Sequence, residues 1–208
     1  MYKYLNIFLE ISKVNIIVGA LSSLGIIILF LGIYINFERA KRQKNIRKKR
    51  KSIVETGTMT LFYFFIYFII VKKIGYYRVE NVEVENMIRL LGALSILIGG
   101  VLNIIGRLNL GKNWANHIII YETHTFVTKG LYSIVRHPLY SSIMLMFYGA
   151  SLAFSNYMVI VLTSIIFIPF MNYRAKQEEE ELLKIFPEYK EYKKRVWRFF
   201  PKIIRRNK

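Results

Sequence analysis

The chain has 208 residues and a formal net charge of +18, and 54% of its residues are hydrophobic. A soluble domain of this size could not bury so much apolar surface, so the composition favours a membrane protein. The sequence contains no cysteine, which excludes disulfide bonds, cysteine-ligated metals and a thiolate nucleophile. In a membrane protein, an excess of positive charge is expected in cytoplasmic segments that face anionic lipid headgroups.

The first apolar run, Val14 to Phe37, contains 24 residues and no charge. At ~1.5 Å per residue it can cross a ~30 Å hydrocarbon core, and it is too long for the hydrophobic region of a signal peptide. The following segment, Glu38 to Ser52, has nine Lys or Arg residues and one Glu. We expect this segment in the cytoplasm and the N-terminus outside. Topogenic charge explains the cluster most simply, and anionic-lipid binding is the alternative. The cluster lacks the interleaved aromatic residues of a nucleic-acid site.

Two further spans are predicted from apolar composition, at Ile53 to Val71 and at Met87 to Gly106. The connection between them, Lys72 to Asn86, has three basic and three acidic residues, so it is expected outside. The next stretch, Arg107 to Pro138, is too polar to cross the membrane and is expected in the cytoplasm. Four glycines of the third span would allow close helix–helix approach: Gly92, Gly99, Gly100 and Gly106.

Leu139 to Tyr173 is a run of 35 uncharged residues. A single helix of that length would be ~52 Å long, which exceeds the thickness of a bilayer core. Ser155 and Asn156 favour a turn near the middle of the run. The run therefore predicts a hairpin of two short spans, Leu139 to Phe154 and Tyr157 to Asn172.

The tail, Arg174 to Lys208, has twelve Lys or Arg residues and six Glu residues and is expected in the cytoplasm. The sequence therefore predicts an all-α fold, a polytopic membrane helical bundle of about five transmembrane helices, with a C-terminal helical hairpin and a cytoplasmic helical tail. We expect a single membrane domain, residues 1–208, in which residues 1–106 form three N-terminal spans and residues 107–208 form the remaining half.

Arg136, His137 and Pro138 stand directly before the predicted hairpin. Pro138 disfavours helical geometry at His137 and suits the first position of a helix. Backbone N–H groups at such a helix start can bind an anion, with the guanidinium of Arg136 as a further donor. These three residues alone are compatible with two interpretations, a capped membrane helix with an interfacial arginine or an anion-binding site.

A second charged cluster follows the hairpin and begins with Arg174 and Glu178, which are four residues apart and share a helix face. Because a helical hairpin returns the chain to the side that it left, this cluster is expected close to residues 136–138. Consecutive residues of a helix point in different directions, so the four glutamates from 178 onward do not predict a metal site. The last two, Glu180 and Glu181, are expected on a solvated face.

Together the two clusters resemble the isoprenylcysteine carboxyl methyltransferase family, whose wider group includes phospholipid N-methyltransferases. The pattern V-T-x-G-x-Y-x-x-x-R-H-P-x-Y is followed by a hydrophobic hairpin and then by R-x-x-x-E-E-x-x-L-x-x-x-F. The resemblance covers Leu110 to Ile203. Ser142 stands where the family often has glycine, which predicts looser packing there. The residues that carry the pattern are Val127, Thr128, Gly130, Tyr132, Arg136, His137, Pro138, Tyr140, Arg174, Glu178, Glu179, Leu182 and Phe186.

The resemblance implies a membrane methyltransferase that uses S-adenosylmethionine and modifies a lipophilic or lipid-modified acceptor, either a prenylcysteine-like carboxylate or a lipid amine. It implies catalytic roles for Arg174, which would bind an acceptor carboxylate, and for Glu178. An amine acceptor must be unprotonated, and Glu178 or His137 could then accept its proton. No metal and no nucleic-acid partner are expected. Residues 107–208 would form the cofactor-binding catalytic half, with cofactor contacts from Val127, Gly130, Tyr132, Arg136, His137, Pro138, Tyr140, Glu178 and Glu179.

Two other functions are alternatives. One is an NADPH-dependent membrane reductase of the sterol-reductase type, whose C-terminal region also shows a stretch like RHPxY. The other is a non-enzymatic membrane protein that binds anionic lipid through its basic segments. The R-x-x-x-E-E cluster favours methyl transfer over both, and the sequence leaves the identity of the acceptor open.

Overall fold

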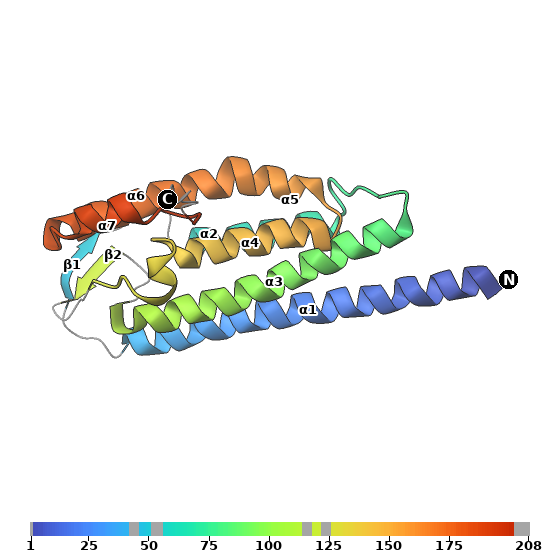
Figure 1. The fold of residues 1–208 in the computed structure, drawn as a ribbon, viewed down its shortest axis with the longest axis horizontal. Coiled ribbons are helices and arrows are strands. Elements are labelled where there is room, and N and C mark those ends of the chain that lie inside the picture. The colour runs from blue at the N-terminus through green and yellow to red at the C-terminus, as the bar shows by residue number, and fades with distance from the viewer. Residues whose placement is uncertain (1, 42–45, 51–55, 114–117, 122–125, 202–208) are drawn as a thin grey trace, which may run out of the picture.

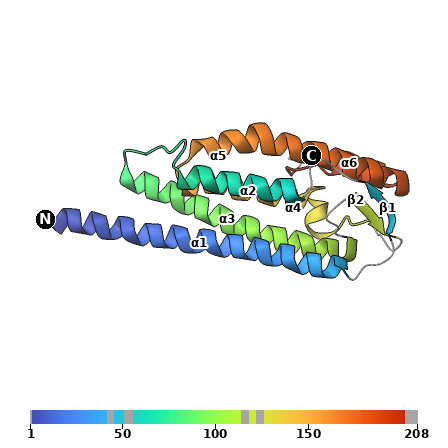
Figure 2. The same cartoon turned by 180° about the vertical axis from the view of Figure 1, so that it is seen from behind.

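The computed structural model describes residues 2–41, 46–50, 56–113, 118–121 and 126–201. Its long helices run side by side along one axis, and the turns and the tail lie at the two ends (Figure 1, Figure 2). A short helix, α7 (Tyr189–Arg195), belongs to the tail. In chain order the bundle helices are α1 (Tyr2–Lys41), α2 (Thr56–Val71), α3 (Val82–Leu110), α4 (Pro138–Ala153), and a last helix built from α5 (Tyr157–Leu162), the π-turn η3 (Thr163–Phe167) and α6 (Ile168–Ile185).

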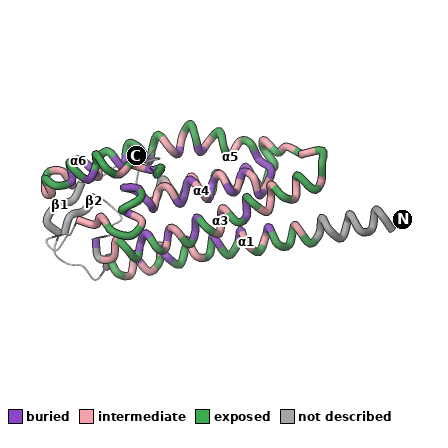
Figure 3. The backbone as a smooth tube through the Cα atoms, in the orientation of Figure 1, coloured by how far each residue is buried: buried purple, intermediate pink, exposed green. Residues whose placement is uncertain are grey.

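Three of the described helical segments are long and apolar enough to cross a membrane, at Lys13–Arg39, Val82–Leu110 and Tyr157–Ile185. Large apolar side chains point away from the bundle, as lipid-facing residues do, and Ile16 and Leu61 are 68% and 70% exposed. Figure 3 shows exposed residues along the outer sides of the helices and buried residues where helices face one another. The predicted helical membrane bundle is therefore confirmed. The count of five spans stays a prediction, because α2 and α4 have only 16 residues each.

The third helix is longer than the sequence predicts. It begins at Val82, where the side chain of Asn81 accepts hydrogen bonds from the N–H groups of the first turn, and Glu83 in that turn favours the positive end of the helix dipole. At the other end the helix passes Gly106 and continues to Leu110. Arg107 was expected in a cytoplasmic loop. It lies instead inside the bundle and is 7% exposed.

The predicted hairpin turn is confirmed. Ser155 has a positive φ of 48°, and the side chain of Asn156 caps α5 by accepting from the N–H of Met158. The hydroxyl of Ser151 donates to the Asn156 carbonyl at 2.7 Å. A π-turn then widens the returning helix just before Pro169. Proline has no N–H to offer the preceding turn, so an interruption of the regular helix at this point follows from its chemistry.

Close helix packing relies on glycine, as the third span predicts. A Cβ on Gly100 would lie 2.5 Å from the carbonyl oxygen of Gly25 in α1, and a Cβ on Gly92 would lie 2.3 Å from the backbone nitrogen of Ala153 in α4. Gly99 is similarly close to the Ser142 carbonyl, at 2.8 Å. These distances leave no room for a side chain, so α3 is held against α1 and α4 by backbone approach.

Aromatic side chains fill the space between α2 and the hairpin. The Phe147 ring packs against Phe62 at 5.4 Å between centroids and against Phe167 at 4.9 Å, and both pairs have edge-to-face geometry. Such pairs contribute roughly 0.5–1.5 kcal/mol beyond the area that they bury. The shorter α2 is thereby fixed to both arms of the hairpin.

A two-stranded antiparallel ribbon, which the sequence did not predict, accompanies the helices. Strand β1 (Ile46–Arg50) pairs with β2 (Ile118–Tyr121), so that Ile46 lies opposite Tyr121 and Arg50 lies opposite Ile118. The ribbon lies at the end of the bundle near α6 and α7 (Figure 1). Part of the basic segment after α1 is thus placed at that end.

Replacing Gly25 with alanine is expected to destabilise the bundle. The new Cβ would lie 2.8 to 2.9 Å from backbone atoms of Ile96 and Leu97, so α1 and α3 must separate at a cost of roughly 1–3 kcal/mol. The measurement is thermal unfolding in detergent. Gly19→Ala is the matched control, because a Cβ there meets nothing within 4 Å and alanine favours helix. Equal melting temperatures for the two variants would contradict this packing.

Candidate functional site

The segment before α4 is folded onto the end of α3. Gly130 has a φ of 61° and begins a 3-10 turn that ends at Ser133. The N–H of Leu131 donates to the Asn109 side chain at 3.0 Å, and a Cβ on Gly130 would lie 2.3 Å from that same oxygen. Gly130 is therefore required for the turn and for its close contact with α3.

The RHP stretch adopts the predicted helix start. His137 has non-helical backbone geometry, with φ −126° and ψ 64°, and Pro138 is in the first turn of α4. The imidazole does not cap the helix and points toward the glutamates of α6. The backbone of His137 therefore starts the helix, while its ring interacts with the glutamates.

The part of the tail directly after α7 runs along this helix start. We call residues 196–199 the tail segment. The N–H of Arg136 donates to the Trp197 carbonyl at 2.8 Å, and the N–H of His137 donates to the Arg198 carbonyl at 3.0 Å. The Ser141 hydroxyl donates to the Phe199 carbonyl at 2.7 Å. These bonds pair the tail segment with the chain as it enters α4.

Glu179 is at the centre of the charged cluster, and its side chain is only 1% exposed. Arg136 donates to it from Nε and Nη2 at 3.1 and 2.9 Å. Arg198 donates to both carboxylate oxygens at 2.9 Å. Nε2 of His137 is 3.1 Å from Oε1, and Nζ of Lys193 is 3.3 Å from Oε2. Each carboxylate oxygen therefore has more than one charged partner.

Glu178 has a second set of partners and is more accessible, with 26% of its side chain exposed. The hydroxyl of Tyr140 donates to its Oε1 at 2.6 Å, and Nε of Arg174 donates to the same oxygen at 3.1 Å. Nδ1 of His137 is 3.5 Å from Oε2. The His137 ring stacks on Tyr140 with centroids 5.5 Å apart. His137 thus bridges Glu178 and Glu179 through its two ring nitrogens.

The two glutamates determine the protonation of this histidine. Burial lowers the pKa of His137, but hydrogen bonds to Glu178 and Glu179 and the charges of these groups outweigh burial, and they raise that pKa above its ordinary value. A protonated imidazole donates from both nitrogens, which suits a ring between two carboxylates. The hydrogen bonds with Glu179 likewise raise the pKa of Arg198.

Aromatic packing anchors the tail helix α7. The Phe126 ring lies 5.3 Å from the ring of Tyr189 and 5.1 Å from that of Tyr192, and it stacks on Phe186 at 6.0 Å. The hydroxyl of Tyr192 donates to the Tyr132 carbonyl at 2.5 Å. Burial raises the pKa of Tyr189 and of Tyr192, so both phenols stay neutral. The tail helix therefore packs on the segment that leads into α4.

A polar cluster inside the bundle lies beneath this site. Nε of Arg107 donates to the Asn103 side chain at 2.7 Å, and Nδ2 of Asn103 donates to Oγ of Ser142 at 2.7 Å. The Ser142 hydroxyl donates in turn to the Leu139 carbonyl at 2.8 Å. The expectation of looser packing at Ser142 is wrong. The serine is 2% exposed, and its hydroxyl joins α3 to α4.

The structure brings together most of the residues predicted for the site. Tyr132 meets the tail through its carbonyl, and Pro138 starts α4. Val127 is half-buried in the stretch before Gly130, and Gly130 itself packs on Asn109 of α3. The predicted residues that interact directly with one another are Arg136, His137, Tyr140, Arg174, Glu178 and Glu179.

Sequence reasoning missed Lys193 and Arg198, because a basic residue of the tail carries no local signal that it will meet Glu179. The prediction of a solvated Glu181 is wrong, since that residue is 3% exposed and pairs with Lys184 at 2.7 Å. Among the described residues, no group of three His, Asp or Glu side chains is placed to hold a metal ion. His117 and His124 lie outside the described residues.

The stability that His137 contributes is expected to fall with rising pH. Its pKa is higher in the folded chain than in the unfolded one, so its ion pairs stabilise the fold fully below the unfolded pKa of about 6.5 and are lost as pH rises through the folded value. The measurement compares thermal unfolding of the wild type and of His137→Gln across this pH range. The advantage of the wild type should be largest at acid pH. An advantage that is constant or grows with pH would rule out the charged bridge.

Loss of the Arg198 guanidinium is expected to release the tail segment. Arg198→Gln removes two hydrogen bonds to Glu179, and limited proteolysis should then cut after α7 several-fold faster than in the wild type. Arg195→Gln removes the same charge from an exposed residue three positions earlier. If both variants are cut at the same rate, Arg198 does not hold the tail.

Part of the chain is similar to known proteins. Residues 90–184 match the model of the isoprenylcysteine carboxyl methyltransferase family. The chain is 36% identical over 110 residues to protein-S-isoprenylcysteine O-methyltransferase of Xenopus laevis. These residues make up 51% of the chain and 38% of that protein. The corresponding human protein is 34% identical over 109 residues, which covers 50% of the chain and 38% of the protein.

The chain is also similar to the cobalt-zinc-cadmium resistance protein CzcN of Cupriavidus metallidurans, with 30% identity over 130 residues, 62% of the chain and 56% of that protein. The chain spans less than two thirds of the length of each of these relatives. The matched residues 90–184 include the RHP stretch, the hairpin and both site glutamates. The comparisons thereby confirm that these residues resemble the isoprenylcysteine carboxyl methyltransferase family.

Proposed function

We propose that this chain is an integral-membrane methyltransferase that uses S-adenosylmethionine to methylate a carboxylate on a lipophilic, prenylcysteine-like acceptor. The relatives that are named isoprenylcysteine O-methyltransferases support this class of reaction. The observation that carries the proposal is the charge of the site. Four cations, Arg136, Arg174, Lys193 and Arg198, surround two carboxylates, so the site has a surplus of positive charge.

The residues of the site fit the cofactor chemically. S-adenosylmethionine carries a carboxylate, an ammonium group and ribose hydroxyls. Glu178 is the more exposed carboxylate and suits the ammonium group or a hydroxyl, while Arg136 and the surplus cations suit the carboxylate. Glu179 already accepts from Arg136, His137 and Arg198, so we assign it the task of positioning these side chains around the cofactor.

The surplus charge favours a carboxylate acceptor over an amine. When bound, S-adenosylmethionine supplies an electrophilic methyl group, which a carboxylate oxygen takes without a general base. Orientation is then the main task of the protein, and Arg174, held by Glu178 at 3.1 Å, is placed to orient that carboxylate. Methylating an amine would require a neutral nucleophile and would leave a cation among cations, which the electrostatics oppose.

Charge distribution supports a cytoplasmic site. Strand β1 places the basic residues 47–50 at the end of the bundle that carries the glutamates (Figure 1). Positive segments of this length stay in the cytoplasm, so we place the site and the tail in the cytoplasm and the start of α1 outside. The acceptor would then reach the site laterally from the bilayer.

Transfer of labelled methyl from S-adenosylmethionine tests the proposal, with the full chain in lipid vesicles and N-acetyl-S-farnesylcysteine as acceptor. We expect a labelled methyl ester. Arg174→Gln should lower kcat about a hundredfold, because the acceptor loses its orientation, and should leave cofactor affinity unchanged. Glu178→Gln should weaken cofactor binding. Lys176→Gln is the control, since Lys176 is an exposed cation of the same helix.

Three outcomes would oppose the proposal. Label on the amine of a phospholipid in place of the prenylcysteine would exclude carboxyl methylation. Thermal stabilisation by NADPH, with none by S-adenosylhomocysteine, would favour a reductase. Equal activity of the Arg174 and Lys176 variants would remove Arg174 from the reaction.

A further inference from the structure

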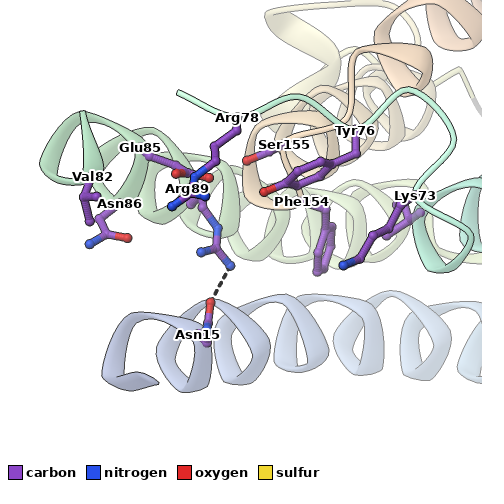
Figure 4. A pocket seen from close by; sticks show the side chains of 11 residues that line it. Asn15, Lys73, Tyr76, Arg78, Val82, Glu85, Asn86, Arg89, Phe154 and Ser155 are labelled. Atoms are coloured by element: carbon purple, nitrogen blue, oxygen red, sulfur yellow. Dashed lines mark hydrogen bonds between the residues drawn. The ribbon is translucent and has the colours of Figure 1, made fainter. Parts of the chain in front are cut away.

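A cavity of about 400 Å³ opens at the end of the bundle opposite the glutamates (Figure 4). The site lies where α4 begins, at Pro138, whereas the cavity lies just past the end of α4, at Phe154 and Ser155. Its other walls come from Asn15 in the first half of α1, from the end of α2 and its connection to α3, and from the first turns of α3. None of the residues that carry the proposed methyl transfer lines this cavity.

The cavity has a surplus of positive charge. Lys73 and Arg78 come from the connection between α2 and α3, and Arg89 comes from α3 itself. Glu85 is the single acid among the described lining residues. Asn15 adds a side-chain amide from α1. Concave sites lined by one sign of charge concentrate ions of the opposite sign, so this cavity favours an anion.

The walls of the cavity are held in place before any ligand binds. Nη2 of Arg89 donates to Oδ1 of Asn15 at 2.7 Å, as Figure 4 shows, and its Nε donates to the Ala153 carbonyl at 3.2 Å. The N–H of Tyr77 donates to the Ser155 carbonyl at 2.9 Å, and the N–H of Tyr157 donates to the Gly75 carbonyl at 3.0 Å. These bonds join α1, α3, the connection between α2 and α3, and the hairpin turn into a preorganised site, which reduces the entropic cost of binding.

The surroundings of the cavity indicate the kind of anion. Ile16 and Met87, next to the lining residues Asn15 and Asn86, are 68% and 56% exposed, so lipid-facing surface begins at its rim. The charged connection between α2 and α3 covers the other side. The cavity thus lies at the boundary between hydrocarbon and water, where the phosphates of phospholipids are found.

We propose that this cavity binds the phosphate group of a phospholipid headgroup, with Lys73, Arg78 and Arg89 as its ligands. The bound lipid bridges α1, α3 and the hairpin turn from the side opposite the candidate active site. A soluble phosphate ester has the same chemistry at its phosphate, but it lacks the acyl chains that the exposed apolar rim would contact. This proposal rests on the cavity alone and is independent of the proposed methyl transfer.

The test uses the purified full chain in phosphatidylcholine nanodiscs that contain a minor fraction of phosphatidylglycerol, with retained lipid measured by native mass spectrometry. The variant is Lys73→Asn/Arg78→Gln. Asparagine tolerates the positive φ of 54° at position 73, and Arg89 is kept because it bonds to two other segments. Lys13→Gln/Lys72→Gln is the matched control. It removes two exposed cations that are close in sequence to the lining residues Asn15 and Lys73. Neither of the two lines the cavity.

We expect the cavity variant to retain phosphatidylglycerol roughly thirtyfold less than the wild type, since it lacks two basic residues and each basic residue near a headgroup contributes a factor of about five. The control should match the wild type. Glycerol 3-phosphate added in detergent should stabilise the wild type against heat far less than phosphatidylglycerol does. Equal retention by the wild type and the cavity variant, or equal losses in both variants, would overturn the site. Equal stabilisation by the soluble ester and the lipid would overturn the lipid assignment.

Discussion

The candidate site depends on one buried carboxylate. Glu179 is 1% exposed, and removing an isolated carboxylate from water to that extent costs several kcal/mol unless charged partners and hydrogen bonds compensate. The partners come from separate parts of the chain, Arg136 and His137 before α4, Lys193 in α7, and Arg198 in the tail segment. Each part that leaves takes a charged partner away from this buried carboxylate, so the site and the closed tail stabilise each other.

Much of the architecture could be predicted from local signals. An uncharged run too long for one span, with Ser155 and Asn156 at its middle, predicts the hairpin, and the hairpin in turn predicts that His137 meets Glu178 and Glu179. Each step needs only helix length, turn chemistry and the rule that a hairpin returns to its starting side. The same reasoning places Pro138 in the first turn of α4, as the structure confirms.

The remaining features depend on contacts between residues far apart in sequence. Nothing near Arg198 indicates that its backbone pairs with His137 and its guanidinium with Glu179. A polar residue at the end of an apolar run predicts a loop, yet Arg107 stays in α3 because Asn103 accepts its hydrogen bond inside the bundle. The ribbon of β1 and β2 pairs two segments about 70 residues apart in register, and neither segment has a pattern that indicates the other. Tertiary partners decided all three cases.

Helix lengths explain how a charged site could serve an acceptor that stays in the membrane. At ~1.5 Å per residue, the 16 residues of α4 extend about 24 Å, less than a ~30 Å hydrocarbon core. The helix that starts at Tyr157 and ends at Ile185 has 29 residues and extends about 43 Å. Both helices meet at one turn, where α4 ends and the longer helix begins. The first residue of α4 therefore lies short of the end of α6 and close to the level of Glu178, which accepts a hydrogen bond from Tyr140. The short helix therefore places the polar groups at the edge of the hydrocarbon core, where the headgroup of the proposed acceptor would reach them while its chain stays among lipids.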